Sequence, residues 1–234
     1  LIPLIFLFIS RDIFAETQII QFYASDKPPL VYIQGENIGG IFADSLRSIL
    51  KLAGIEFQFQ KVPQVRRRRA FENEEYMIAC CSNPAWRSRV KEQEIQLFSD
   101  SFLTLEDVYV FRKGFKFNEK NPGIHSYALI KGYTYESEDF ITNASRLKTE
   151  KDLLKFIEAQ RADVDIVSRF IAQHYIRKLN FNLEIGPTNF TAPIHIRVNK
   201  KRPDLLKKIN QSIKSLKSNN EFEKIVLNNL NKRD

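Results

Sequence analysis

The most concentrated set of chemically active side chains is a run of four arginines, Arg66 to Arg69. Clustered positive charge binds phosphate groups, so such a run suggests a nucleic-acid surface. The run follows Pro63 in a segment predicted to be helical, however, and four successive residues of a helix point in nearly all directions. Three acidic residues, Glu72, Glu74 and Glu75, follow at once. The sequence therefore favours a solvated helix face and no nucleic-acid partner.

Residues for covalent or metal chemistry are few and scattered. The chain has three His, at positions 125, 174 and 195, and no stretch reads GxGxxG, GxSxG or HExxH. The only two Cys, Cys80 and Cys81, are adjacent, and a bridge between neighbours closes a small strained ring. Both are therefore predicted to be buried free thiols. The sequence predicts no cofactor and no metal site.

The composition is that of a folded, basic protein. Lys and Arg number 36 against 28 Asp and Glu, which gives a net charge of +8, and apolar residues make up 43% of the chain. Nineteen Phe, eight Tyr and one Trp supply large side chains for a core. Intrinsic disorder is therefore excluded, and 234 residues are enough for one large or two small domains.

The chain starts with a short apolar segment, residues 1–10, which ends before Arg11 and Asp12. A membrane-spanning helix needs about 20 apolar residues, so this run is too short to cross a bilayer. Its length suits the core of a signal peptide cleaved after Ala15, and we expect residues 1–15 to be the remnant of one. A buried N-terminal strand is the alternative. The signal interpretation predicts an exported protein.

The elements that must position these residues alternate between helix and strand. A helix with Asp44 as its N-cap and Gly54 just after its end precedes a half-buried strand over residues 55–60. The basic helix and a short apolar strand over residues 77–81 follow. Strand, helix and strand in quick succession predict parallel pairing with crossover helices.

A second α/β block begins near residue 127. A strand over residues 128–130 leads into a turn at Gly132, Thr149 is the predicted N-cap of a helix, and residues 165–168 read as another strand before a further helix. Two amphipathic helices close the chain, the first of them starting at Pro203.

Two long extended segments, residues 102–112 and 191–199, lead into and out of this second block. A block bracketed in this way predicts a domain inserted into another, with its two connections side by side. The predicted lobes are residues 16–110 together with 191–234, and residues 111–190.

The order of short motifs along the chain is more specific than any single one. The motifs are Pro28-Pro29-Leu30, Gly39-Gly40-Ile41-Phe42-Ala43-Asp44, Val62-Pro63-Gln64-Val65-Arg66, Asn83-Pro84-Ala85-Trp86-Arg87, Phe98-Ser99, Ile130-Lys131-Gly132-Tyr133-Thr134-Tyr135 and Arg161-Ala162-Asp163. Over residues 18–230 this order resembles the bacterial extracellular solute-binding proteins of family 3, the polar-amino-acid receptors of ABC importers.

The resemblance implies a two-lobed α/β fold of the type II periplasmic-binding-protein kind. Each lobe is a mostly parallel sheet flanked by helices, and two crossing strands form a hinge that closes on a ligand in the cleft. It also implies a monomeric, non-catalytic periplasmic protein. Its expected partners are a small-molecule solute and an ABC transporter permease, through which alone it would contact the inner membrane.

The resemblance also implies ligand-binding residues. An Arg after the second strand of the first lobe pairs with the ligand carboxylate in this family, so Arg87 is the first choice and Arg89 the second, with Arg66 turned toward the cleft. A guanidinium makes two parallel charge-assisted bonds to a carboxylate. The turn at Tyr133 and Thr134 resembles the loop that donates to the same carboxylate. The remaining members of the predicted site are Tyr32, Asn83, Trp86 and Ser168.

Ser168 departs from the family pattern, which commonly has an Asp there to hold the ligand ammonium. A hydroxyl cannot balance a cation as a carboxylate does. This departure argues against an ordinary amino acid as the ligand, and the expected solute is small, polar or anionic, and amino-acid-like. A peptide-like metabolite and an orphan binding domain are the alternatives. Asp163 and Asp165 are alternative partners for an ammonium group.

Other interpretations of these residues and of the function stay open. Arg87 would equally suit a surface salt bridge, Trp86 and Tyr32 would suit a core, and Arg67 and Arg68 are expected to face away from the cleft. A periplasmic enzyme of the same fold, similar to a cyclohexadienyl dehydratase, would need a general acid such as Glu36 or His195. A ligand-sensing module is the third alternative.

Overall fold

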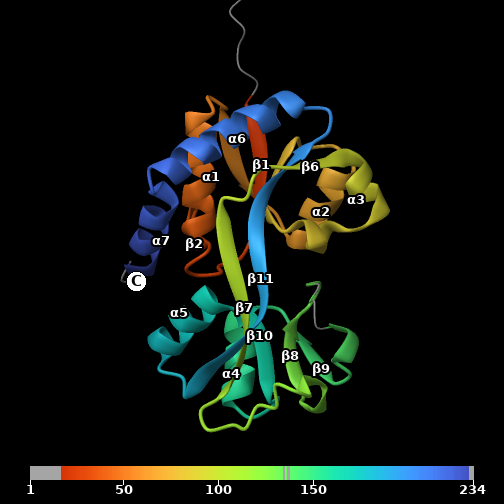
Figure 1. Cartoon of the computed structure of the whole chain (residues 1–234), viewed down its shortest axis with the longest axis vertical. Helices are drawn as coiled ribbons and strands as arrows, with labels where there is room; N and C mark the ends of the chain where they lie inside the picture. Colours follow the sequence, from red (N-terminus) through yellow and green to blue (C-terminus); the bar gives the residue numbers. More distant parts are fainter. Residues whose placement is uncertain (1–16, 134, 136–137, 232–234) are drawn as a thin grey trace, which may run out of the picture.

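The structure is a computed structural model that describes residues 17–133, 135 and 138–231. The predicted signal segment, residues 1–15, lies outside the described residues. Two lobes lie one above the other in Figure 1, and the strands β7 (Leu103–Arg112) and β11 (Leu183–Asn199) run side by side from one into the other. None of the helices in the described part is long and apolar enough to cross a membrane. The predicted two-lobed α/β fold with two crossing strands is confirmed.

Lobe 1, the upper lobe in Figure 1, is built on three parallel strands in the order β4-β1-β5, with β11 antiparallel beside β5. Its strands are β1 (Gln18–Phe22), β2 (Tyr32–Gln34), β3 (Asn37–Gly39), β4 (Phe57–Lys61), β5 (Ile78–Ser82) and β6 (Gln96–Phe98). Its helices are α1 (Ile41–Leu52), α2 (Gln64–Glu72), the 3-10 turn η1 (Pro84–Arg87), α3 (Val90–Ile95), α6 (Pro203–Ser218) and α7 (Glu221–Asn231). The predicted parallel pairing is therefore present.

Lobe 2, the lower lobe, has the sheet order β7-β10-β8-β9, in which β8 is parallel to both neighbours and β10 is antiparallel to β7. Its elements are β8 (Tyr127–Ile130), β9 (Ala144–Leu147), α4 (Glu150–Glu158), β10 (Val164–Ser168), α5 (Arg169–Leu179) and the short 3-10 turns η2 (Pro122–Ile124) and η3 (Glu138–Phe140). The predicted lobe boundaries after residues 110 and 190 stay a prediction, because β7 and β11 run through those positions without a break.

The ends of three helices follow the local signals in the sequence. The backbone N–H of Asp152 donates to Thr149 Oγ1 at 3.1 Å, so Thr149 is the N-cap of α4 as predicted. Gly54, just after α1, has a φ of 64°, the left-handed conformation that glycine adopts without penalty. Pro203 occupies the first turn of α6.

The start of α1 differs from the prediction. The helix begins at Ile41 with Gly40 as its N-cap, so the assignment of Asp44 as the N-cap is wrong. Asp44 lies in the first turn, where its Oδ1 accepts a hydrogen bond from Arg47 Nη1 at 2.7 Å. Gly40 has a φ of 99°, and a Cβ there would lie 2.7 Å from the Leu30 carbonyl oxygen. A glycine is therefore required for α1 to start against the preceding loop.

The two cysteines also differ from the prediction. Cys80 and Cys81 form a disulfide bond, so the prediction of free thiols is wrong. The peptide bond between them is cis, and their Cα atoms lie 3.1 Å apart. No pattern of residues in the sequence predicts this arrangement. Both side chains are buried, as predicted, in β5, which is buried along its whole length between its neighbours.

Candidate functional site

A cavity of ≈ 120 Å³ lies between the two lobes. A cavity of about 150 Å³ is enough to hold a molecule the size of benzene, so this one suits a small organic ion or a few waters. Its lining comes from both lobes and from the crossing strand β7. The charged side chains that line it are Lys27, Arg67, Arg68, Arg87, Asp107 and Glu150.

Helix α2 turns two of its four arginines toward the cavity. Arg67 is 7% exposed and its guanidinium carbon lies 4.0 Å from the ring centroid of Tyr23, while its Nη1 has no hydrogen-bond partner among the described residues. Arg66 and Arg69 are exposed and do not line the cavity. The expectation that Arg66 faces the cleft and that Arg67 and Arg68 face away is therefore wrong.

The inward face of α2 was marked by a signal in the sequence. Ala70 and Phe71 are buried, and they stand three and four residues after Arg67. Residues at this spacing share one face of a helix, so Arg67 must point to the same side as Ala70 and Phe71. The apolar residues that follow the arginine run therefore indicate which arginine faces inward.

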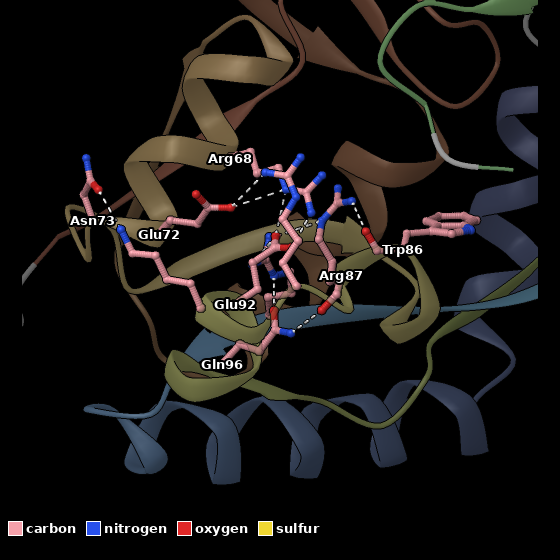
Figure 2. A network of polar contacts seen from close by, with 10 residues as sticks. Arg68, Glu72, Asn73, Trp86, Arg87, Glu92 and Gln96 are labelled. Carbon is pink, nitrogen blue, oxygen red and sulfur yellow. Dashed lines mark hydrogen bonds and ion pairs between the residues drawn. The ribbon is translucent and has the colours of Figure 1, made fainter.

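Behind the cavity, three arginines surround one carboxylate. Glu92 on α3 is fully buried, and Figure 2 shows Arg68 and Arg87 converging on it. Arg68 Nε donates to Glu92 Oε1 at 3.1 Å and its Nη2 bonds the other oxygen, while Arg197 Nη2 donates to Oε1 at 3.2 Å. Arg87 Nε lies 3.8 Å from the same Oε1. The network therefore fixes the orientation of two cavity-lining guanidinium groups.

The positive charge of this network exceeds its negative charge. A second carboxylate, Glu72 Oε1, lies 3.5 Å from Arg68 Nε and 3.8 Å from Arg89 Nη1, so four guanidinium groups stand against two carboxylates. Burial, and then the neighbouring charge of Arg68, lower the pKa of Arg87, and burial lowers the pKa of Arg197 to about 9. A further anion beside these groups would be favourable.

Arg87 reaches the cavity from η1. Its Nη1 donates to the Trp86 carbonyl at 2.8 Å, and its Nε has no hydrogen-bond partner in the described part of the chain. Asn83 holds this turn in place, because its Oδ1 accepts from Ala85 N at 2.8 Å and its Nδ2 donates to the Pro193 carbonyl at 2.8 Å. The alternative that Arg87 forms an ion pair on the surface is wrong, because its partner Glu92 is fully buried.

Lobe 2 presents a hydroxyl and two carboxyl groups to the same cavity. Ser168 is 6% exposed, and its Oγ has no hydrogen-bond partner among the residues described. Its neighbour across the β7 and β10 pairing is Asp107, whose burial raises the carboxyl pKa to about 6. Glu150 stands at the first position of α4 and is reached by Lys27 from lobe 1, with 2.8 Å between Nζ and Oε1.

The structure brings together some of the predicted site residues and separates others. Four line the cavity: Trp86, Arg87, Tyr133 and Ser168. Arg66, Arg89, Asn83 and Tyr32 are absent from its lining, and Thr134 lies outside the described residues. Arg89 is exposed and lies 3.8 Å from Glu72, while Tyr32 lines a different pocket beside His174.

The alternative acidic and catalytic residues also lie outside the cavity lining. Asp163 Oδ2 accepts from Ser126 N at 2.9 Å, and Asp165 is fully buried. Glu36 is exposed and pairs with a lysine, and His195 Nδ1 lies 2.7 Å from a backbone carbonyl oxygen. In the described part of the chain, no group of three or more His, Cys, Asp or Glu side chains could hold a metal ion.

Comparisons with known proteins show the family and the fold. The family described as bacterial extracellular solute-binding proteins, family 3, matches residues 19–231. A relative is the arginine-binding extracellular protein ArtP of Bacillus subtilis (strain 168), 24% identical over 219 residues, which cover 86% of this chain and 82% of ArtP.

Two solved structures share the fold. The arginine-, lysine-, histidine-binding protein ArtJ of Geobacillus stearothermophilus superposes with a TM-score of 0.75 at 15% identity, over 94% of this chain and 97% of ArtJ. A histidine kinase sensor domain with similarity to periplasmic binding proteins superposes with a TM-score of 0.76 at 15% identity, over 92% of this chain and 96% of that domain.

Proposed function

The chain belongs to the bacterial extracellular solute-binding proteins of family 3, and from this premise we propose that it binds a small anionic solute in the cleft between its lobes. One observation carries the proposal. Buried Arg67 and half-buried Arg87 of lobe 1 and Ser168 of lobe 2 all line one cavity. Each carries a buried donor that has no hydrogen-bond partner among the described residues: Arg67 Nη1, Arg87 Nε and Ser168 Oγ.

These three groups explain how a bound anion would stabilise the closed form. An anionic oxygen placed in the cavity would accept from guanidinium groups whose charge is fixed at physiological pH, which makes the bonds charge-assisted. The same anion would accept from Ser168 of the other lobe. Because the donors come from both lobes, the solute gains all its bonds only when the lobes are together, and closure about β7 and β11 follows from binding.

The solute would be delivered to an ABC transporter permease in the periplasm. Support for this role comes from the family and from a similar solved structure, the substrate-binding protein of an amino acid ABC transporter, with a TM-score of 0.72 at 19% identity. The resemblance to a histidine kinase sensor domain supports a second role, the sensing of the same solute. Co-purification of the full-length protein with a permease rather than a kinase separates the two roles.

A thermal-shift screen tests the proposed site. The probes are succinate, L-glutamate, phosphate and sulfate, and a ligand that binds the native state must raise the melting temperature by mass action. We expect at least one anion to do so, and Arg67→Met to lose the shift, because the variant keeps an apolar stem against Tyr23 but has no charged donor.

Arg66→Met is the matched control, since it removes the same charge one residue away on the same helix but from an exposed position. It should keep the full shift. The proposal fails if no anion in the screen raises the melting temperature, or if the two variants lose the shift equally.

A further inference from the structure

Lys27 is enclosed between the lobes in a set of groups that normally recognises a ligand cation. Its Nζ lies 2.8 Å from Glu150 Oε1, 4.4 Å from the ring centroid of Tyr133 and 5.2 Å from that of Tyr23. The Tyr133 hydroxyl also donates to Glu150 Oε1 at 3.1 Å. A carboxylate flanked by two aromatic faces is the arrangement that binds ammonium and guanidinium groups.

This lysine is well buried for a charged residue. Its side chain is 10% exposed and that of Glu150 is 5% exposed. A lysine is rarely buried to this extent unless it is paired, because removing its charge from water is costly. The pair therefore belongs to the interior of the cleft and differs from the ordinary ion pairs of the surface.

The backbone that carries Lys27 is held firmly. Lys27 N and Val31 N each donate to the carbonyl of the other residue, at 2.9 and 3.0 Å. The loop is fixed to the start of α1, since Ile41 N donates to the Pro29 carbonyl and Phe42 N to the Leu30 carbonyl, both at 3.0 Å. Lys27 thus extends into the cleft from a rigid turn.

We propose that Lys27 is a built-in occupant of the cation position of the cleft and makes the site select anions that carry no ammonium or guanidinium group of their own. The inference rests on the proposed solute site. A cationic ligand could reach Glu150 only by expelling Lys27, and the expelled ammonium would lose its partner in a buried setting. That loss opposes binding of such a ligand.

The charge of the cavity lining agrees with this selection. Four basic and two acidic side chains line the cavity. Lys27 neutralises Glu150, so the remaining excess of positive charge lies with the arginines of lobe 1. Without Lys27, Glu150 and the rings of Tyr23 and Tyr133 would form a vacant cation site facing an anion site, the pair of sites that a cationic amino acid needs.

Isothermal titration with L-arginine and L-lysine as probes tests the inference. The wild type should show no heat of binding up to millimolar concentrations, whereas Lys27→Ala should bind at least one of the two at least ten-fold more tightly than the wild type. Lys27→Arg is the matched control, because it keeps a cation in the same place and should remain silent. The double variant Lys27→Ala, Glu150→Gln should lose the affinity that Lys27→Ala gained for these probes, because it has no Glu150 carboxylate.

The outcomes separate this inference from the proposed function. If Lys27→Ala is folded by circular dichroism and gains neither probe, or if the wild type binds L-arginine as tightly as Lys27→Ala, the inference is overturned. Retention of the anion-induced thermal shift by that same variant would then leave the proposed anion site standing. Gain of L-arginine binding by Lys27→Ala, with no anion in the screen bound by the wild type, would support Lys27 as the occupant of the cation position and overturn the proposed anion site.

Discussion

The two walls of the cleft bury charges of opposite sign and compensate them in different ways. In lobe 1, three guanidinium groups surround Glu92, and the compensation comes from within the lobe. In lobe 2, Glu150 is paired with a lysine of the other lobe, while burial raises the carboxyl pKa of Asp107 to about 6. The basic wall therefore keeps its charge at physiological pH. The acidic wall is offset by a lysine across the cleft, and its Asp107 carboxyl group takes up a proton only as the pH falls through about 6.

This difference is the basis for the proposal that the site favours anions. A guanidinium stays ionised when it is buried, so a dense set of arginines offers a lasting positive field to the cavity. A buried carboxyl group can instead take up a proton, which removes its repulsion toward an anion. Four changes test this comparison, beginning with the largest expected effect.

Replacement of Glu92 by Gln should have the largest effect. The change leaves the guanidinium groups of Arg68, Arg87 and Arg197 buried without their common partner, and breaking a buried ion pair costs about 3–5 kcal/mol. Urea denaturation should show the free energy of unfolding reduced by this amount. Glu94→Gln on the same helix is exposed and should change it by less than about 0.5 kcal/mol. Equal effects of the two changes would contradict the assignment of Glu92 as the centre of the basic wall.

Replacement of Asp107 by Asn should remove a pH dependence of stability. Burial raises the carboxyl pKa from 3.8 to about 6, so the folded state holds a proton that the unfolded chain releases. The stabilisation from this proton is complete below pH 3.8 and is lost as the pH rises through about 6, a loss of about 3 kcal/mol.

Melting curves of the wild type and Asp107→Asn between pH 4 and pH 8 measure this effect. The difference between them should be small at pH 4, and the variant should become the more stable protein above pH 6. The exposed residue Asp100, changed to Asn, should give a curve parallel to that of the wild type. A constant difference between wild type and Asp107→Asn at every pH would refute the buried-carboxyl explanation.

Replacement of Ser168 by Ala should separate binding from stability. The hydroxyl has no hydrogen-bond partner among the described residues, so its loss should change the free energy of unfolding by less than about 0.5 kcal/mol. Affinity for an anion that stabilises the wild type should fall by about five- to ten-fold, the value of one hydrogen bond.

Ser126→Ala is the control in the same lobe for the Ser168 change. Its hydroxyl donates to Asp163 Oδ2 at 2.7 Å, so this change should cost about 1 kcal/mol of stability and leave anion affinity unchanged. The reverse pattern in the two variants would show that Ser168 is structural.

Replacement of Glu36 by Gln should have the smallest effect. Its side chain is 93% exposed and pairs with Lys61 at 2.8 Å, and exposed pairs contribute about 0–1 kcal/mol. Stability measured in low and high salt should barely distinguish the variant from the wild type. A loss comparable with that of Glu92→Gln would mean that burial is not what separates the two kinds of ion pair.

The sequence alone indicated the order of the main helices and strands, the two-lobed fold and the family. It did not indicate the short elements β2, β3, β6, β9 and α3, or the strand β1. The order of the elements depends on local signals, such as a Thr before a helix, a Gly after it and the alternation of residues in a strand. Each of these signals involves residues that are close together in the sequence. The confirmed N-cap at Thr149 and the left-handed turn at Gly54 are examples. The segment that became β7 was likewise recognisable, whereas β11 was recognised only over residues 191–199, because the strand begins eight residues earlier at Leu183.

The tertiary structure alone decided which charges meet in the cleft. Lys27 and Glu150 are 123 residues apart, and no local pattern indicates that a lysine of one lobe pairs with the first residue of a helix in the other. Cys80 and Cys81 are likewise joined through a backbone geometry that their residue types do not specify. Burial and pairing of charge depend on the whole surroundings of a group, and those surroundings exist only after the lobes have come together.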